Sequence, residues 1–350
     1  MENILIFPLN SDTQILIDQL HGSTKYKVVA VSSYYEDKKR LEEMQQKYNI
    51  YCDCSFDNSL KRVDTVIFAN DNMGHKSHGY RERVLMAIEQ NKKIYIQKDL
   101  LDNLSLNENT KNLYVFQKEQ LVDNHEKNNL KEINVPIISI MGLGENCDKF
   151  NLQVKVKKII EDKGFKVLGI SSNVMGFFLD MEILPGFLFS KQISYPEKIR
   201  AFNYWLYEIQ KLYNADVIVM GCPSGILEFE QYESNFYGEI PLVMTNAVDI
   251  DAGIITLYAN SEQNGDTIQY LKNFVQKKYA VEVNNFVVSS KYYQVNQEWR
   301  HITYYNIPKR KPLSYRGTNK IIISCIEEDG SIKKQVDTIV NKLENNFFSI

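Results

Sequence analysis

The chain has 350 residues, of which 44% are hydrophobic and 24% are charged. This composition is typical of folded globular proteins and argues against a disordered or fibrous chain, while the length allows two medium-sized domains. The 41 Lys and Arg residues nearly balance the 44 Asp and Glu residues, which leaves a net charge of −3. Such a balance does not indicate a nucleic-acid-binding protein.

The sequence carries no pattern typical of a membrane or secreted protein. Its longest apolar runs, such as IISIMG at 137–142, are too short to span a bilayer. Met1 is followed by Glu2 and not by the basic and apolar segments of a signal peptide. The odd number of cysteines, five, favours reduced thiols over a disulfide framework. We therefore expect a cytoplasmic protein that does not contact a membrane.

The N-terminal part, residues 1–125, alternates short apolar segments with amphipathic ones. We expect strands at 3–8, 26–31, 50–54, 65–69, 93–96 and 113–116, and helices at 13–20, 36–48 and 80–91. This alternation predicts a doubly wound α/β domain with a parallel sheet, that is, a Rossmann-like domain.

This first domain lacks the glycine fingerprint of dinucleotide-binding proteins. Its first strand–helix turn, from Pro8 to Thr13, contains no glycine, and Ser32 and Ser33 stand where an acid that binds ribose is expected. We therefore interpret it as a Rossmann-like module without a dinucleotide.

A second α/β unit begins at Pro136. We expect strands at 136–141, 165–170, 216–220, 242–245, 254–258 and 282–288, and helices at 150–163, 196–214 and 267–278. Residues 132–308 are interpreted as a P-loop-like parallel α/β domain. Residues 309–350 are interpreted as a C-terminal extension with one strand, 321–325, and one helix, 332–344.

The loop between the first strand and first helix of this domain is the strongest candidate site. A loop in this position presents backbone N–H groups and the positive end of a helix dipole to an anion. Gly142 and Gly144 let the backbone approach a phosphate, and Lys149 stands where a P-loop lysine would reach it.

The match to a P-loop is incomplete. Aligned on the lysine, Leu143 replaces the first glycine of the motif, Asp148 the second, and Phe150 the hydroxyl residue that binds Mg²⁺. From the spacing alone, a phosphate site and a tight turn with structural glycines remain alternatives.

Two further loops are expected at the same edge of the sheet. Ligands of doubly wound sheets lie beyond the carboxyl ends of the strands, where GCPSG at 221–225 follows strand 216–220. Gly221 and Gly225 permit close backbone approach, and Ser224 supplies a hydroxyl. Cys222 is a candidate nucleophile, although a buried structural cysteine is the commoner case.

The third loop, 245–249, follows the strand expected at 242–245. Asp249 or Asp251 could complete the pocket or hold a metal, with a solvated turn as the alternative. His75 and His78 are interpreted as part of a polar loop and not as metal ligands, because no carboxylate or thiol pair stands at zinc-site spacing around them. We predict no metal site.

Several segments resemble a known family. They include NILIFPLNSD at 3–12, VPIISIMGLGENCDKFNLQ at 135–153 and ADVIVMGCPSGILEF at 215–229. These segments look like the clostridial peptide maturation system proteins, and the resemblance extends over about residues 3–305. Members of that family are encoded beside a bacteriocin-like precursor peptide and a radical SAM enzyme, so the resemblance implies these two partners. The positions that fit the family pattern are Gly142, Gly144, Glu145, Lys149, Phe150, Gln153, Ser171, Ser172, Pro223 and Gly225.

The resemblance implies a pathway and not a reaction, so two functions remain open. In the first, the protein is an accessory protein in the maturation of a ribosomally synthesised, bacteriocin-like peptide. Its degenerate P-loop-like domain then binds a nucleotide, such as ATP or GTP with magnesium, or another phosphate ligand. The expected binding residues are Gly142, Gly144, Glu145, Lys149, Phe150, Gly221, Ser224, Gly225 and Asp249.

In the second, the protein is a catalytically silent scaffold that binds the precursor peptide or the radical SAM partner. Peptides add to exposed sheet edges or lie in apolar grooves, and the aromatic surface around Tyr204, Trp205 and Tyr207 is a candidate for such a contact. The sequence assigns no catalytic residue in either case.

Overall fold

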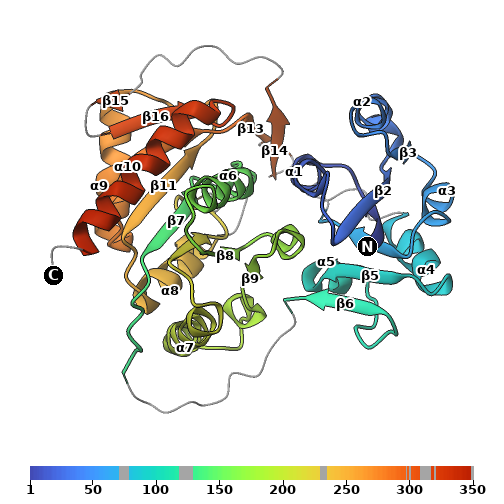
Figure 1. Ribbon diagram of the computed structural model, residues 1–350, viewed down its shortest axis with the longest axis horizontal. Helices are drawn as coiled ribbons and strands as arrows, with labels where there is room; N and C mark the ends of the chain where they lie inside the picture. Colours follow the sequence, from blue (N-terminus) through green and yellow to red (C-terminus); the bar gives the residue numbers. More distant parts are fainter. Residues whose placement is uncertain are drawn as a thin grey trace. The chain divides into compact units, whose positions relative to one another are not determined.

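The computed structural model describes residues 1–70, 79–117, 129–228, 235–296, 298, 301–307, 317–318 and 321–347 (Figure 1). The chain forms two compact units. Unit 1 contains Met1–Gln120 and Val174–Gly186, and unit 2 contains Leu121–Asn173 and Phe187–Ile350. Both units are built of α-helices and largely parallel sheets, which confirms the predicted class of a Rossmann-like domain followed by a P-loop-like α/β domain.

Unit 1 has a six-stranded sheet in the order β3-β2-β1-β4-β5-β6, the order of doubly wound dinucleotide-binding folds. All neighbouring strands in it are parallel. Its elements are β1 (Glu2–Phe7), α1 (Ser11–Leu20), β2 (Tyr26–Ser32), η1 (Tyr35–Asp37), α2 (Lys38–Tyr48), β3 (Tyr51–Asp53), α3 (Phe56–Leu60), β4 (Thr65–Phe68), α4 (Tyr80–Glu89), β5 (Lys93–Gln97), α5 (Lys98–Asn103) and β6 (Leu113–Phe116). The short helices α3 and α5 are not evident in the sequence, because five or six residues show no helical period.

A segment from the middle of the sequence also belongs to unit 1. This segment, Val174–Gly186, contains η2 (Val174–Leu179) and β9 (Glu182–Ile183). The ring of Phe178 is 2% exposed and lies 5.0 Å from the ring of Tyr95 in β5 and 5.4 Å from that of Tyr26 in β2. Residues that are remote in sequence therefore complete the core of the first unit.

The sheet of unit 2 contains the strands β15-β16-β12-β11-β7-β10-β8 in that order. Its elements are β7 (Ile137–Gly142), α6 (Lys149–Glu161), β8 (Val167–Ser171), η3 (Gly186–Phe189), α7 (Tyr195–Tyr213), β10 (Val217–Gly221), η4 (Phe236–Gly238), α8 (Glu239–Ala247), β11 (Ala252–Leu257), α9 (Gly265–Tyr279), β12 (Val283–Val288), β15 (Gly317–Thr318), β16 (Ile321–Cys325) and α10 (Asp329–Phe347). Every residue of β7 is buried, and β7 lies between β11 and β10. The loop that follows β7 therefore begins in the middle of the row of carboxyl strand ends. Helices α6 and α10 pack side by side on one face, where their apolar residues share a core with β7, β10 and β11 (Figure 1).

The strand expected at 242–245 is wrong, because these residues lie in the helix α8. The buried residues Val243, Met244 and Ala247 have the spacing of one helical face. The four-residue apolar run LVMT does not distinguish a strand from a buried helix, and tertiary packing against α7 and α9 decides for the helix.

The strand and the helix described within 309–350 do not form a separate extension. Strand β16 pairs in parallel with β12, and α10 packs on α6, so both belong to unit 2. Helix α10 buries Ile332, Val336 and Ile339 in the shared core. No helix among the described residues is long and apolar enough to cross a membrane.

After β12 the chain forms a two-stranded antiparallel hairpin, β13 (Lys291–Asn296) and β14 (His301–Asn306). It is a sheet of its own within unit 2. Four tyrosines lie on its two strands, Tyr292 and Tyr293 on β13 and Tyr304 and Tyr305 on β14.

Candidate functional site

The loop from Gly142 to Asp148 connects the central strand β7 to the 13-residue helix α6. It is fixed at its start, because the N–H of Leu143 donates to the carbonyl oxygen of Thr256 in β11 at 3.1 Å. Asp148 precedes the helix with φ 54° and ψ 23°, which is the left-handed conformation that glycine favours. The backbone therefore turns at this position as it would with the glycine of the motif. The first N–H groups of α6 have no acceptor in a preceding helical turn and point towards this loop.

The side chain of Lys149, the first residue of α6, folds back into the loop. It is only 9% exposed, and its ammonium donates to the carbonyl oxygens of Gly144 at 2.6 Å and Ser224 at 2.7 Å. One carboxylate oxygen of Glu145 lies 3.8 Å from the Lys149 nitrogen, and the Glu145 side chain is 42% exposed. The positive charge is thus held within the loop, and its two short hydrogen bonds go to neutral oxygens.

Gly142 provides the space for this lysine. A Cβ at Gly142 would lie 2.9 Å from Cδ of Lys149 and 2.7 Å from Oγ1 of Thr256, both closer than ordinary contacts. Any larger residue would therefore push the Lys149 stem out of its path.

The loop at 221–225 lies directly against the first loop, as expected from the strand order. The N–H of Ile226 donates to the carbonyl oxygen of Gly142 at 2.9 Å, and the N–H of Leu227 donates to that of Leu143 at 3.3 Å. A Cβ at Gly225 would lie 2.4 Å from the Leu143 oxygen. The predicted convergence of these two loops is confirmed. Ser224 contributes its backbone carbonyl to Lys149.

Gly221 has a structural reason of its own. A Cβ there would lie 2.8 Å from Oε1 of Gln153, a buried side chain of α6. The amide nitrogen of Gln153 donates to the carbonyl oxygens of Ile170 at 2.6 Å and Val219 at 3.0 Å. Gln153 thus ties α6 to β8 and β10 behind the loop.

The carboxylate of Asp148 binds the residues that follow β12. Its Oδ2 accepts hydrogen bonds from the hydroxyls of Ser289 and Ser290, each at 2.7 Å, and from the N–H of Ser290 at 2.8 Å. Its other oxygen lies 3.7 Å from the buried ammonium of Lys291. The acid that replaces the glycine of the motif is therefore paired within the protein, and it links the loop to the base of the tyrosine hairpin.

Phe150 offers no oxygen at the position where a hydroxyl would bind magnesium. Its side chain is buried, at 6% exposure, in the first turn of α6. Glu145 carries the exposed carboxylate of this loop. The residues present therefore do not fit the magnesium site of a standard P-loop.

The candidate nucleophile Cys222 does not have the properties of a reactive thiol. It is 1% exposed and lies 3.3 Å from the Ser139 hydroxyl. Burial raises the pKa of Cys222 to about 11 and that of Cys147 in the first loop to about 12. A thiol needs its ionised form to attack, so both cysteines are structural.

Asp249 lies at the opposite edge of the sheet, which corrects its expected place in the site. Helix α8, and not a strand, precedes it, and β11 follows it. The N–H of Asp251 donates to the carbonyl oxygen of Ile137 at the start of β7. Asp251 also borders a cavity of about 60 Å³ with Glu282 and Lys342, and burial raises its pKa. Neither aspartate adjoins the loop.

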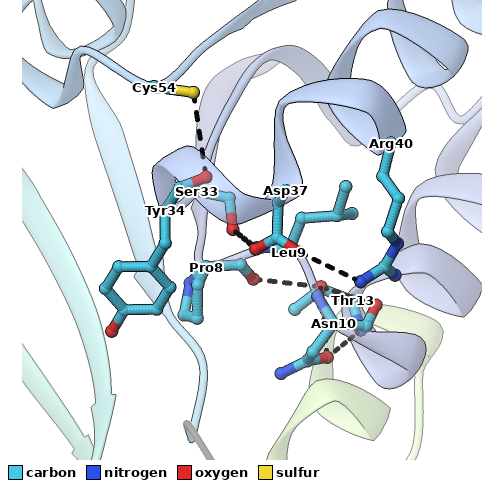
Figure 2. A network of polar contacts seen from close by, with 9 residues as sticks. All are labelled: Pro8, Leu9, Asn10, Thr13, Ser33, Tyr34, Asp37, Arg40 and Cys54. Atoms are coloured by element: carbon cyan, nitrogen blue, oxygen red, sulfur yellow. Dashed lines mark hydrogen bonds and ion pairs between the residues drawn. The ribbon is translucent and has the colours of Figure 1, made fainter. Parts of the chain in front are cut away.

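The corresponding turn of unit 1 is closed by its own side chains (Figure 2). Oδ1 of Asn10 accepts from the N–H of Thr13 at 2.9 Å, and Oγ1 of Thr13 accepts from the N–H of Asn10 at 2.8 Å. The N–H of Leu9 donates to the hydroxyl of Ser33 at 3.1 Å, and that hydroxyl donates to Asp37. These backbone N–H groups, which a pyrophosphate would need, are bonded within the chain.

The pair His75 and His78 lies outside the described residues. Within the described ranges, no three His, Cys, Asp or Glu side chains come together to hold a metal ion.

Three residues that contact the loop from the ends of β11 and β12 are not among the site residues predicted from the sequence. Tyr258 directly follows β11 and its hydroxyl donates to the carbonyl oxygen of Glu145. Ser289 and Ser290 follow β12 and hold Asp148. The rule that ligands gather at the carboxyl ends of parallel strands would have indicated all three residues.

Comparison with known proteins supports the fold and goes no further. No protein-family model and no curated protein matches the chain. The crystal structure of a DUF1611 family protein from Anabaena variabilis is similar with a TM-score of 0.56 at 10% identity, over 83% of this chain and 88% of that one. At this identity the likeness shows a shared two-domain fold only.

Two further solved structures are similar to parts of the chain. A cobyrinic acid a,c-diamide synthase from Mycobacterium smegmatis with bound ADP and magnesium has a TM-score of 0.32 at 11% identity, over 44% of this chain and 74% of that one. A UDP-N-acetylglucosamine 3-dehydrogenase from Acidithiobacillus ferrooxidans has a TM-score of 0.24 at 14% identity, over 30% of this chain and 33% of that one. Both scores are too low to support an argument about function.

Proposed function

We propose that the protein is an accessory protein of peptide maturation whose unit 2 binds the phosphate group of a nucleotide or similar ligand at the loop 142–149. The single observation that carries the binding proposal is the nearly buried ammonium of Lys149 at the N-terminus of α6. The assignment to peptide maturation is supported by the family resemblance of the sequence, which also implies the precursor peptide and a radical SAM enzyme as partners.

The electrostatics of the loop favour an anion. A buried positive charge is stabilised best by a charged partner. The two hydrogen-bond acceptors of Lys149 are neutral carbonyls, and the Glu145 carboxylate lies 3.8 Å away, beyond hydrogen-bond distance. The positive end of the α6 dipole acts in the same direction. A phosphate at this loop would pair with the ammonium and accept hydrogen bonds from the first N–H groups of the helix.

Magnesium is not part of this proposal. Phe150 supplies no ligand oxygen, so we expect phosphate binding that does not require the metal. This departs from ATP or GTP bound with magnesium, the ligands expected from the P-loop pattern.

Lys149→Met tests the proposal, because methionine keeps the unbranched stem over Gly142 and removes the charge. We expect ATP, GTP or pyrophosphate to raise the melting temperature of the full chain, as any ligand of the folded state does. The substitution should weaken binding by roughly 10- to 100-fold, the value of a charged hydrogen bond. Each ligand is measured with and without Mg²⁺ by thermal shift and by calorimetry.

Lys158→Met is the matched control, since Lys158 lies on the exposed face of the same helix. It removes the same charge from α6 and should leave binding unchanged. Equal weakening by both substitutions, or no binding of any phosphate ligand to the wild type, would contradict the proposal.

The alternative is a catalytically silent scaffold. One observation favours it: the Lys149 ammonium donates to the carbonyl oxygens of Gly144 and Ser224 within the protein itself. In that case no phosphate ligand shifts the melting temperature, and the precursor peptide is captured equally by the wild type and by Lys149→Met.

A further inference from the structure

A cluster of tyrosine rings, Tyr258, Tyr293 and Tyr304, begins at the loop that holds Lys149. Tyr258 is fully buried behind this loop, and its hydroxyl donates to the carbonyl oxygen of Glu145. The side chain of the same Glu145 lies 3.8 Å from the Lys149 ammonium. Glu145 therefore contacts both the Lys149 ammonium and the first ring of the tyrosine cluster.

The other two rings of the tyrosine cluster belong to the hairpin β13–β14. Tyr293 and Tyr304 are directly opposite each other on its two strands. Their ring centroids lie 4.8 Å and 5.9 Å from that of Tyr258, and both side chains are partly exposed. The hairpin thus presents two tyrosines on the side that contacts Tyr258.

A second pair of tyrosines lies on the other side of the hairpin. Tyr292 and Tyr305 are paired across the strands and stack with their centroids 5.2 Å apart. Successive side chains of a strand point to opposite faces, so this pair faces away from Tyr258. Tyr305 is 42% exposed.

The hairpin is tied to the loop at its base. Asp148 binds Ser289 and Ser290, which immediately precede β13, and lies 3.7 Å from the ammonium of Lys291, the first residue of β13. The N–H of Ala259, the residue after Tyr258, donates to the carbonyl oxygen of Lys291 at 2.8 Å. The departure from glycine at position 148 therefore places the tyrosines next to the loop.

We infer that the partly exposed rings of Tyr293 and Tyr304, which pack on the buried Tyr258, receive the base of a nucleotide whose phosphate lies on the loop 142–149. This inference rests on the proposed phosphate site and adds the class of ligand. A nucleotide carries its aromatic base one ribose away from its first phosphate. A phosphate loop that adjoins a partly exposed aromatic surface can therefore be bridged by one such ligand. Every base has an aromatic face that can stack on a tyrosine ring, so stacking depends little on which base is present. We therefore expect both ATP and GTP to bind.

The test separates the base from the phosphates. Affinities for ATP and for inorganic tripolyphosphate are measured by calorimetry for the wild type, Tyr304→Leu and Tyr304→Phe. Tyr304→Leu should weaken ATP roughly 5- to 100-fold, as expected for one lost stacking contact, and should leave tripolyphosphate unchanged. Tyr304→Phe keeps the ring and should bind ATP as the wild type does.

Tyr305→Leu is the matched control from the next position on the same strand. It removes a tyrosine from the opposite face of the hairpin and should affect neither ligand. Unchanged ATP affinity in Tyr304→Leu, or an equal loss for ATP and tripolyphosphate, would overturn the inference.

The two proposals fail in different ways. If Lys149→Met weakens ATP and tripolyphosphate while Tyr304→Leu changes neither, the phosphate site stands and the base site falls. If the wild type binds neither ligand, both proposals fall.

Discussion

The buried lysine and the buried thiols around the loop have different surroundings. The Lys149 ammonium donates to backbone oxygens of the two loops, whereas the thiols of Cys147 and Cys222 are each 1% exposed. An ionised thiolate would lose its hydration there, which is why the pKa of each thiol is raised from about 9 to about 12 and about 11. These cysteines therefore contribute packing and not nucleophilic chemistry.

The raised pKa values of the two thiols predict a loss of stability at alkaline pH. Above pH 9 the thiols ionise in the unfolded chain but remain protonated in the folded one. The unfolded state then binds fewer protons, and the free energy of unfolding falls as the pH rises, by up to about 1.4 kcal/mol per pH unit for each thiol. Urea unfolding in reducing buffer at pH 8, 9 and 10 should show a shallower fall for the double variant Cys147→Ala, Cys222→Ala than for the wild type. Equal slopes would refute this explanation.

At the scale of elements, the geometry of the site depends on the close contact of two loops. The segments after β7 and after β10 approach so closely that the position of a Cβ at Gly225 falls against backbone atoms of Leu143 and Gly144. Backbone cannot rotate away as a side chain can. The sequence separation of these segments means that only the pairing of β7 with β10 brings them together.

We therefore expect Gly225→Ala to force the two loops apart. The substitution should lower the free energy of unfolding by about 1–3 kcal/mol, as overpacking in other proteins does. Gly330→Ala is the control, because a Cβ at Gly330 in the first turn of α10 meets no atom within 4 Å. It should leave stability unchanged or raise it by up to about 1 kcal/mol. Urea denaturation measures both variants, and an equal effect of the two would count against the loop contact.

At the scale of the whole molecule, the chain order and the unit boundaries do not coincide. The two units are assembled from four segments, so the chain passes from one unit to the other three times. The segment Val174–Gly186 follows β8 of unit 2 but packs its aromatic side chains in unit 1. Unit 1 is therefore not a simple N-terminal domain.

A substitution in this segment should destabilise the first unit. Phe178→Ala removes a ring that contacts Tyr95, Tyr26 and Phe116, and Phe to Ala changes in cores cost about 3–5 kcal/mol. Hydrogen exchange of the full chain should show faster exchange in β5 and β6 and unchanged exchange in β7. The neighbouring Phe177 is 37% exposed, so Phe177→Ala should have a clearly smaller effect. Loss of protection in β7 instead would contradict the assignment of this segment to unit 1.

Local patterns along the chain were sufficient to predict most of the elements and part of the site. Alternating apolar segments indicated the six strands of unit 1, and the carboxyl-end rule brought 142–149 and 221–225 together correctly. The same rule placed Asp249 wrongly, because it was applied to a strand that does not exist. The hairpin β13–β14 with its tyrosines was not predicted. The sequence of a hairpin outside the main sheet does not indicate which part of the protein it packs against.

The sequence by itself determined the α/β class, the absence of a glycine turn in the first domain and the glycines and lysine of the second. These follow from the period of apolar residues and from local backbone freedom, which neighbours in sequence control. Only the tertiary structure decided that Asp148 binds Ser289 and Ser290, and that Val174–Gly186 completes the first unit. These features depend on contacts between residues that are far apart in the chain, and such contacts arise from packing and charge pairing after the elements have formed.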